Sequence, residues 1–436
     1  MNHGRNITRR QWSAVGALAA VLVVAGAWAQ ADAAPRIVER ELADLDSGPP
    51  QDVRQVAFSA DGRRIAWVRV EGDKHVVVCE GRESPPYDAV SGLAWSPDGR
   101  HFGFAASRDG VHFIVLDGIE GRKFTSVRGP VFSPNGKHVA FFAAFGGNRG
   151  YVVYDGVVRR KFSAAGQEAP VFSPDSRHLA YEARSGGGSR HTASVRDPNR
   201  DPNPNEPDPT VVTEDGKEVD VGSAGTSRTN FMVRDEQRGE RCSDVRSPVF
   251  SPNSRILAYA AAFAGKWFIV RDDKIAGKLY DQVTRPVFSP DSRSLAYAAK
   301  LKDKWFVVQG KEEGEPFDRI GLLRFSPDGE RLACAAQQGR QWFIICEGRK
   351  GPACQGIDWV GFSTDGRHLA YVARQGRHRS VMVCDGFQCP PHARIVVPAK
   401  ADEIKDRLRY VVIDGGKARL VELAWPAETN WSNGLK

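Results

Sequence analysis

One sequence pattern recurs along this chain of 436 residues: an aromatic residue, a turn, and then a segment rich in strand-forming residues. The copy F-S-P-D-S-R-H-L-A-Y, which starts at Phe172, is typical. A near-constant period of this length indicates a repeat architecture whose units share one core. Successive copies lie 37, 37, 40, 78, 38, 37 and 37 positions apart, anchored by Phe58, Trp95, Phe132, Phe172, Phe250, Phe288, Phe325 and Phe362.

Each copy predicts four short strands. Ser-Pro-Asp-Gly is turn chemistry, because Pro fixes φ and the Ser and Asp side chains bond nearby backbone amides. A third apolar segment begins at residues such as Trp267 and Trp305, and an Asp-Gly or Glu-Gly turn then leads to a short fourth strand. Four strands in about 37 residues is the size of one propeller blade. We therefore predict an all-β fold, a single β-propeller over residues 36–425, in which the repeated Trp and Phe side chains pack between blades.

The number of blades stays open between eight and nine. Residues 395–398, 408–414 and 417–425 look like a worn ninth copy with three strands. Residues 36–45 would supply its outer strand and close the ring between the two termini. The gap of 78 residues is one blade plus an insertion, so we predict a polar loop at residues 185–229 of the fourth blade, and a C-terminal tail at residues 426–436.

The N-terminus predicts export. Arg5, Arg9 and Arg10 precede an apolar stretch at residues 14–28, and small residues follow up to Ala33. This is typical of a signal peptide at residues 1–33, of the twin-arginine-like or the Sec type. The stretch is shorter than the roughly 20 residues that span a bilayer, so we expect no membrane span after cleavage. The predicted location is periplasmic or secreted.

The sequence offers little catalytic chemistry. The formal net charge is +8, but basic and acidic residues alternate, which disfavours a nucleic-acid partner. G-x-S-x-G, H-E-x-x-H and C-x-x-C motifs are missing, and the acidic residues of the 185–229 loop lack EF-hand spacing. We therefore predict no enzyme, no catalytic residue, no metal site and no cofactor. Four histidines share one repeat position, where we expect them to be solvated: His101, His138, His178 and His368.

Two pairs among the seven cysteines flank turns and are candidate disulfides in an oxidising compartment: Cys346 with Cys354, and Cys384 with Cys389.

One candidate site survives on the innermost strands. In each copy the residue four positions before the anchoring aromatic varies while its neighbours repeat, and it should lie at one rim of the central channel. A variable, charged position is where a propeller would hold a ligand or a peptide. The charged members of this set are Arg54, Arg128, Glu168, Arg246 and Asp358.

The segment F-S-P-D-G-R-x-L-A-Y, followed by W-F-V-V and Asp-Gly turns, resembles the TolB-type repeat, a Trp-Asp-like β-propeller family. The resemblance covers about residues 50–425 and implies the fold more strongly than a function. We expect a monomeric, non-catalytic scaffold that binds a protein or an envelope polymer. The alternative is a lyase or hydrolase that acts on an acidic polysaccharide at the channel mouth, and a third hypothesis is a purely structural propeller without a ligand.

Overall fold

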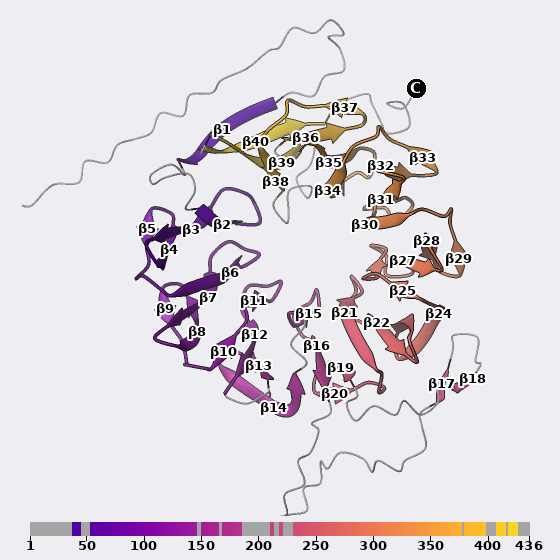
Figure 1. The fold of residues 1–436 in the computed structure, drawn as a ribbon, viewed down its shortest axis with the longest axis horizontal. Helices are drawn as coiled ribbons and strands as arrows, with labels where there is room; N and C mark the ends of the chain where they lie inside the picture. The colour runs from indigo at the N-terminus through magenta and orange to yellow at the C-terminus, as the bar shows by residue number, and fades with distance from the viewer. Residues whose placement is uncertain are drawn as a thin grey trace, which may run out of the picture.

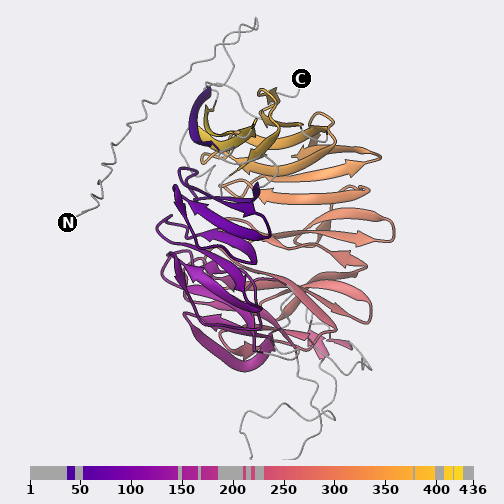
Figure 2. The same ribbon diagram turned by 60° about the vertical axis from the view of Figure 1, so that its left-hand side comes forward.

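The computed structural model describes residues 37–44, 53–145, 150–164, 168–184, 210–212, 218–220, 230–376, 379–397, 407–415 and 417–425. Within these ranges the chain is all-β, and its strands form a ring of nine blades in chain order (Figures 1 and 2). The predicted β-propeller is therefore confirmed, with nine blades out of the eight or nine that the repeats allowed. The predicted signal peptide at residues 1–33 and the tail at residues 426–436 lie outside the described residues.

The blades share one order of strands, from the axis of the ring outwards (Figure 1). The innermost strands are β2 (Val53–Phe58), β6 (Ala89–Trp95), β10 (Ser126–Val127) with β11 (Val131–Phe132), β15 (Val171–Phe172), β21 (Asp244–Phe250), β25 (Gln282–Val283) with β26 (Val287–Phe288), β30 (Arg319–Phe325), β34 (Gly356–Phe362) and β38 (Arg394–Val396). The second strands are β3 (Ile65–Glu71), β7 (Phe102–Arg108), β12 (Val139–Ala144), β16 (Leu179–Arg184), β22 (Leu257–Phe263), β27 (Leu295–Leu301), β31 (Leu332–Gln338), β35 (Leu369–Gly376) and β39 (Arg407–Asp414).

The outermost strand has only two residues in six of the nine blades. The third strands are β4 (Lys74–Cys79), β8 (Val111–Leu116), β13 (Gly150–Tyr154), β19 (Asn230–Arg234), β23 (Lys266–Arg271), β28 (Lys304–Gln309), β32 (Gln341–Cys346), β36 (Arg379–Cys384) and β40 (Lys417–Ala424). The outermost strands are β5 (Arg82–Glu83), β9 (Ile119–Glu120), β14 (Val157–Ala164), β20 (Gln237–Arg238), β24 (Lys274–Tyr280), β29 (Glu312–Glu313), β33 (Arg349–Lys350), β37 (Phe387–Gln388) and β1 (Ile37–Asp44).

The ninth blade closes the ring, because its outer strand comes from the opposite end of the chain. Strand β1 pairs antiparallel with β40, with Ile37 opposite Leu423, as the indigo strand beside the yellow ones shows (Figure 2). The guanidinium of Arg419 reaches the carboxylate of Glu39 at 2.8 Å. This blade lacks the anchoring aromatic, and Trp425 instead stacks on His368 of the eighth blade, with ring centroids 5.4 Å apart and planes at 10°.

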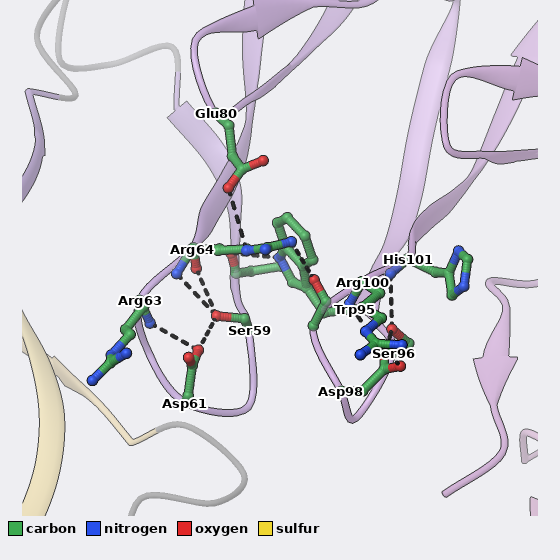
Figure 3. Close-up of polar contacts among 12 residues, drawn as sticks. Ser59, Asp61, Arg63, Arg64, Glu80, Trp95, Ser96, Asp98, Arg100 and His101 are labelled. Carbon is green, nitrogen blue, oxygen red and sulfur yellow. Dashed lines mark hydrogen bonds and ion pairs between the residues drawn. The ribbon is translucent and has the colours of Figure 1, made fainter. Parts of the chain in front are cut away.

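The repeated turn is held by its own side chains (Figure 3). In the first copy the buried Ser59 hydroxyl donates to the Asp61 carboxylate at 2.6 Å and accepts the Arg64 N–H at 2.9 Å. Asp61 in turn accepts the Arg63 N–H at 3.1 Å. The Arg64 guanidinium donates across to the Gly99 carbonyl of the next blade's turn at 2.5 Å. The turn motif therefore fixes the exit of each innermost strand and ties neighbouring blades together.

The core lies between the blades. One cluster combines Ala260 and Ile269 of the fifth blade with Phe288 and Tyr297 of the sixth, and Trp267 packs against it. Burying side chains of this size supplies most of the favourable free energy of such a ring. This confirms the prediction that the repeated aromatic residues pack between blades.

Most of the predicted 185–229 insertion lies outside the described residues. Two short stretches of it are described, β17 (Thr210–Val212) and β18 (Glu218–Asp220), which pair as an antiparallel hairpin. The predicted polar loop therefore contains a short hairpin in its described residues, and its bounds stay a prediction.

Candidate binding site on the innermost strands

A pocket of about 290 Å³ lies where the innermost strands of the second, third and fourth blades come together. We call it the inner-strand pocket. Apolar side chains supply most of its lining, with Phe142 of β12 buried among them. It is lined by Gly92, Leu93, Ala94, Arg128, Gly129, Pro130, Val131, Phe142, Ala169 and Pro170.

The pocket exists because one repeat position holds only small residues in three consecutive blades. Three residues before the anchoring aromatic stand Gly92, Gly129 and Ala169. The next four blades have larger side chains at this position: Ser247, Arg285, Leu322 and Trp359. The pocket lies beside these small residues, in the sector of the second to fourth blades.

Two of these small residues touch through their backbones. A Cβ atom on Gly92 would lie 2.6 Å from the Cα of Gly129, closer than real Cβ atoms come to another atom. Gly92 also has φ of +63°, which L side chains rarely adopt. Glycine is therefore required at position 92 by both the available space and the backbone conformation. The innermost strands of the second and third blades are in direct backbone contact at Gly92 and Gly129.

A β-bulge sits at this point of several innermost strands. The register shifts between Ser91 and Ala94 in β6, and between Arg246 and Val249 in β21. Bulges bend a strand and redirect its side chains. In the third blade the residues four and three before the aromatic, Arg128 and Gly129, both line the pocket, whereas in the second blade Gly92 lines it and Ser91 does not.

Arg128 is the charged member of the lining. It is exposed, and its backbone N–H donates to the Phe142 carbonyl at 2.9 Å, which fixes the strand over the buried ring. Of the five charged residues predicted from the sequence, Arg128 alone lines this pocket.

The other predicted site residues are spread around the ring and do not meet at one site. The carboxylate of Glu168 accepts the Ser247 N–H at 2.8 Å and the Ser247 hydroxyl at 3.0 Å, which ties the fourth blade to the fifth. Asp358 pairs with Arg374 of its own blade at 3.1 Å. The side chain of Arg54 lies outside the described residues.

Arg246 takes an unusual position in the fifth blade. Its guanidinium carbon lies 3.5 Å from the centroid of the Trp267 ring, a cation–π contact. Its Nε atom is buried without a hydrogen-bond partner among the described residues. The side chain is thus held against the blade by the indole.

The innermost segments carry an excess of positive charge. They hold seven basic residues against three acidic ones, counted over the innermost strands, the residues between β10 and β11 and between β25 and β26, and Glu168 just before β15. Each acidic residue has a partner: Glu168 with Ser247, Asp358 with Arg374, and Asp244 with the N–H of Val245 at 2.9 Å. The surroundings of the axis therefore favour a ligand with negative charge.

The repeated histidines are structural and are not simply solvated. Nδ1 of His101 donates to the carboxylate of Asp117 at 2.7 Å, which joins the turn after the first strand of the blade to the turn after the third. The same contact recurs for His138, His178 and His368. The expectation of solvated histidines is wrong for His368, which is buried together with Asp385.

The ninth blade holds a further pair, His392 with Asp414 at 2.6 Å, which the repeat alignment does not reveal. Burial opposes ionisation of Asp414, but the Ala393 N–H and the His392 ring together outweigh it and lower the pKa of this carboxyl.

The strand register separates the two candidate disulfides. All seven cysteines are free thiols. Cys346 pairs with Arg349 at one end of β32, whereas Cys354 lies opposite Trp342 at the other end. Four residues of strand separate these ends by about 13 Å, so a Cys346–Cys354 bridge does not fit the register.

Cys384 and Cys389 are placed differently. The Cys389 N–H donates to the Met382 carbonyl at 2.8 Å, and both thiols are buried in one cluster between the eighth and ninth blades. Burial, and next the neighbouring Cys389 thiol, raise the pKa of the Cys384 thiol.

Among the described residues no group of three or more His, Cys, Asp and Glu side chains is arranged to hold a metal ion. The same ranges contain no helix that is long and apolar enough to cross a membrane.

Sequence reasoning found Arg128 but missed the pocket beside it. The signal was present, since the residues three before the aromatic are Gly, Gly and Ala in adjacent copies. This signal did not identify a pocket because a glycine within a strand is equally typical of a turn or a bulge.

Comparisons with known proteins support the fold. The family model "WD domain, G-beta repeat" matches residues 74–114, from the third strand of the first blade to the third strand of the second. No curated protein matches the chain.

Two of three similar solved structures are described as propellers. A eukaryotic initiation factor has a TM-score of 0.46 at 11% identity, with 81% of this chain and 93% of that chain covered. The Dos1 propeller has a TM-score of 0.41 at 10% identity, with 85% and 91% covered. The Cps50 (Swd1) β-propeller domain of Myceliophteria thermophila has a TM-score of 0.31 at 14% identity, with 85% and 96% covered.

Proposed function

We propose that this protein is a non-catalytic scaffold of the cell envelope, periplasmic or secreted, which holds a binding partner at the inner-strand pocket. The fold suits a binding role, because a ring of blades presents a rigid, preformed concave surface. The repeat sequence, which resembles the TolB type, is compatible with an exported scaffold, and we include membership of that family in the proposal.

The observation that carries the proposal is the mostly apolar pocket beside Arg128, which lies where Gly92 and Gly129 bring two blades into backbone contact and Ala169 adds little bulk from the fourth blade. The equivalent positions of the next four blades carry larger side chains, so the small residues that border this pocket are particular to one sector of the ring. A mostly apolar pocket with one cation is the usual composition of a binding site.

The test compares two variants that add bulk at the same repeat position. Ala169→Phe fills the pocket, whereas Leu322→Phe enlarges an exposed residue of the seventh blade. Each tagged protein is incubated with envelope extract at near-physiological salt, and the bound material is quantified by mass spectrometry.

We expect at least one component whose capture falls about tenfold or more with Ala169→Phe and is unchanged with Leu322→Phe, because the phenyl ring occupies the space of the partner. Identical capture by wild type and both variants would refute a role for the pocket. Fractionation of cells into cytoplasm and envelope compartments tests the location, and a purely cytoplasmic protein would contradict the export part of the proposal.

A further inference from the structure

The inner-strand pocket has the size of one apolar side chain. An apolar cavity of about 150 Å³ is large enough for benzene. The pocket has about 290 Å³, so a phenyl or branched aliphatic group fits with room for the atoms that attach it. Phe142, Pro130 and Pro170 supply apolar contacts, and hydroxyl groups are missing from the lining.

The lining is poorly suited to a saccharide. Sugar hydroxyls need hydrogen-bond partners when they lose water, and each group left without one weakens binding. The residues of this lining are apolar or glycine, apart from Arg128. The occupant is therefore mostly apolar, with a negative charge at one side.

Arg128 lies in the same lining as the apolar side chains, so the charge and the apolar group of the occupant must be close together. A guanidinium binds a carboxylate through two parallel hydrogen bonds. At the end of a polypeptide the carboxylate and the side chain leave the same Cα atom. An internal Asp or Glu would need a second residue to supply the apolar group.

We infer that the inner-strand pocket binds the C-terminal residue of a polypeptide, with its apolar side chain among Phe142, Pro130 and Pro170 and its carboxylate at Arg128. This inference rests on the proposed function and names the chemistry of the partner. The excess of basic residues on the innermost segments attracts the same end of the chain.

The experiment uses the whole protein and two labelled tetrapeptides of the sequence glycine-serine-glycine-phenylalanine. One peptide has a free C-terminal carboxylate, and the other ends in a C-terminal amide. Fluorescence anisotropy gives the dissociation constants for wild type, Arg128→Gln, Ala169→Phe and Leu322→Phe. Circular dichroism and the melting temperature confirm that each variant is folded. A tetramer of a uronic acid serves as a competitor.

We expect wild type to bind the acid at least about tenfold more tightly than the amide, because only the acid pairs with the guanidinium. Arg128→Gln should bind acid and amide equally, Ala169→Phe should bind neither, and Leu322→Phe should match wild type. Equal binding of acid and amide by wild type, or a preference that survives in Arg128→Gln, would overturn the inference. The inference would also be overturned if the uronate tetramer bound to the protein and neither peptide did.

The two proposals fail differently. If envelope capture depends on Ala169 but neither peptide binds, the scaffold role stands and the C-terminal specificity is wrong. If the acid peptide binds with the expected dependence on Arg128 while capture from the envelope ignores Ala169→Phe, the pocket chemistry stands and the envelope role is wrong.

Discussion

The contact between Gly92 and Gly129 gives the sharpest test of how the ring is packed around the inner-strand pocket. In Gly129→Ala the new Cβ would lie 2.7 Å from the Cα and 2.9 Å from the carbonyl oxygen of Gly92, whereas ordinary contacts of a Cβ begin at about 3.4 Å. Both clashing atoms are backbone, so no rotamer change relieves them. Gly129 does not have a positive φ, so the effect measures packing alone.

The innermost strands of the second and third blades must separate by about 0.7 Å to accept this methyl group, which is the difference between the contact of 2.7 Å and the limit of 3.4 Å. Overpacking of this kind costs about 1–3 kcal/mol. A propeller of about 390 residues has an unfolding entropy of about 0.8 kcal/mol/K at its melting temperature, so we expect a decrease of about 1–4 °C.

The control is Gly321→Ala, in the innermost strand of the seventh blade. Its Cβ would lie 3.4 Å from the nearest atom, a ring carbon of Trp342, which is an ordinary contact. We expect the melting temperature of this variant to stay within about 1 °C of wild type. Differential scanning calorimetry measures both. Equal shifts for the two variants, or a stabilised Gly129→Ala, would refute the packing argument.

Three further outcomes follow from contacts described above. His368→Ala should lower the free energy of unfolding by about 1.5–3 kcal/mol, because it removes the charge-assisted hydrogen bond of the buried Asp385. His101 holds the same repeat position but is half-exposed, so His101→Ala should cost less than about 1 kcal/mol. Urea titration of the two variants measures the difference, and equal losses would contradict it. After refolding with oxidised glutathione, which accepts the two electrons, peptide mapping should find a Cys384–Cys389 disulfide and no Cys346–Cys354 disulfide; the reverse would show that the strand register is wrong. The Ser96 hydroxyl, followed by the Arg100 N–H, lowers the pKa of Asp98, and the carboxyls of Asp175 and Asp291 are lowered in the same way by the equivalent turn groups. The stabilisation from these turns is therefore present above the unfolded pKa near 3.8 and is lost as the pH falls through the lower folded values. The urea midpoint should be level from pH 7 to 5 and fall below pH 4, and a midpoint that already declines above pH 5 would contradict this.

Much of this architecture could be predicted because the turn-and-strand motif of a blade occurs eight times in the sequence. The turn chemistry leaves Ser and Asp or Asn at fixed offsets in all eight copies and Pro in six of them, and the anchoring aromatic marks the innermost strand. Closure by residues 36–45 was predictable because the ninth copy lacked one strand.

The details of the site depend on geometry that a repeat alignment does not contain. The bulge between Ser91 and Ala94 brings a different residue of the strand to the pocket, and a period of two along the strand cannot show it. Cys346 and Cys354 look adjacent in the sequence because they flank one turn, but the register sends them to opposite ends of β32. His368 stacks on Trp425, which belongs to the worn ninth copy and has no counterpart in the other eight.

The pairing of β1 with β40 joins residues about 380 positions apart, such as Arg419 and Glu39. The entropy lost in joining distant points rises only with the logarithm of the intervening length, so this contact is not much less favourable than a local one. It is, however, the last that a chain made from its N-terminus can form. Until residue 424 has been synthesised, the eight preceding blades form an open ring with two exposed end blades, and β1 has no strand to pair with. During that interval a second copy of the chain could supply the missing strand, so assembly at high concentration risks interlocked dimers.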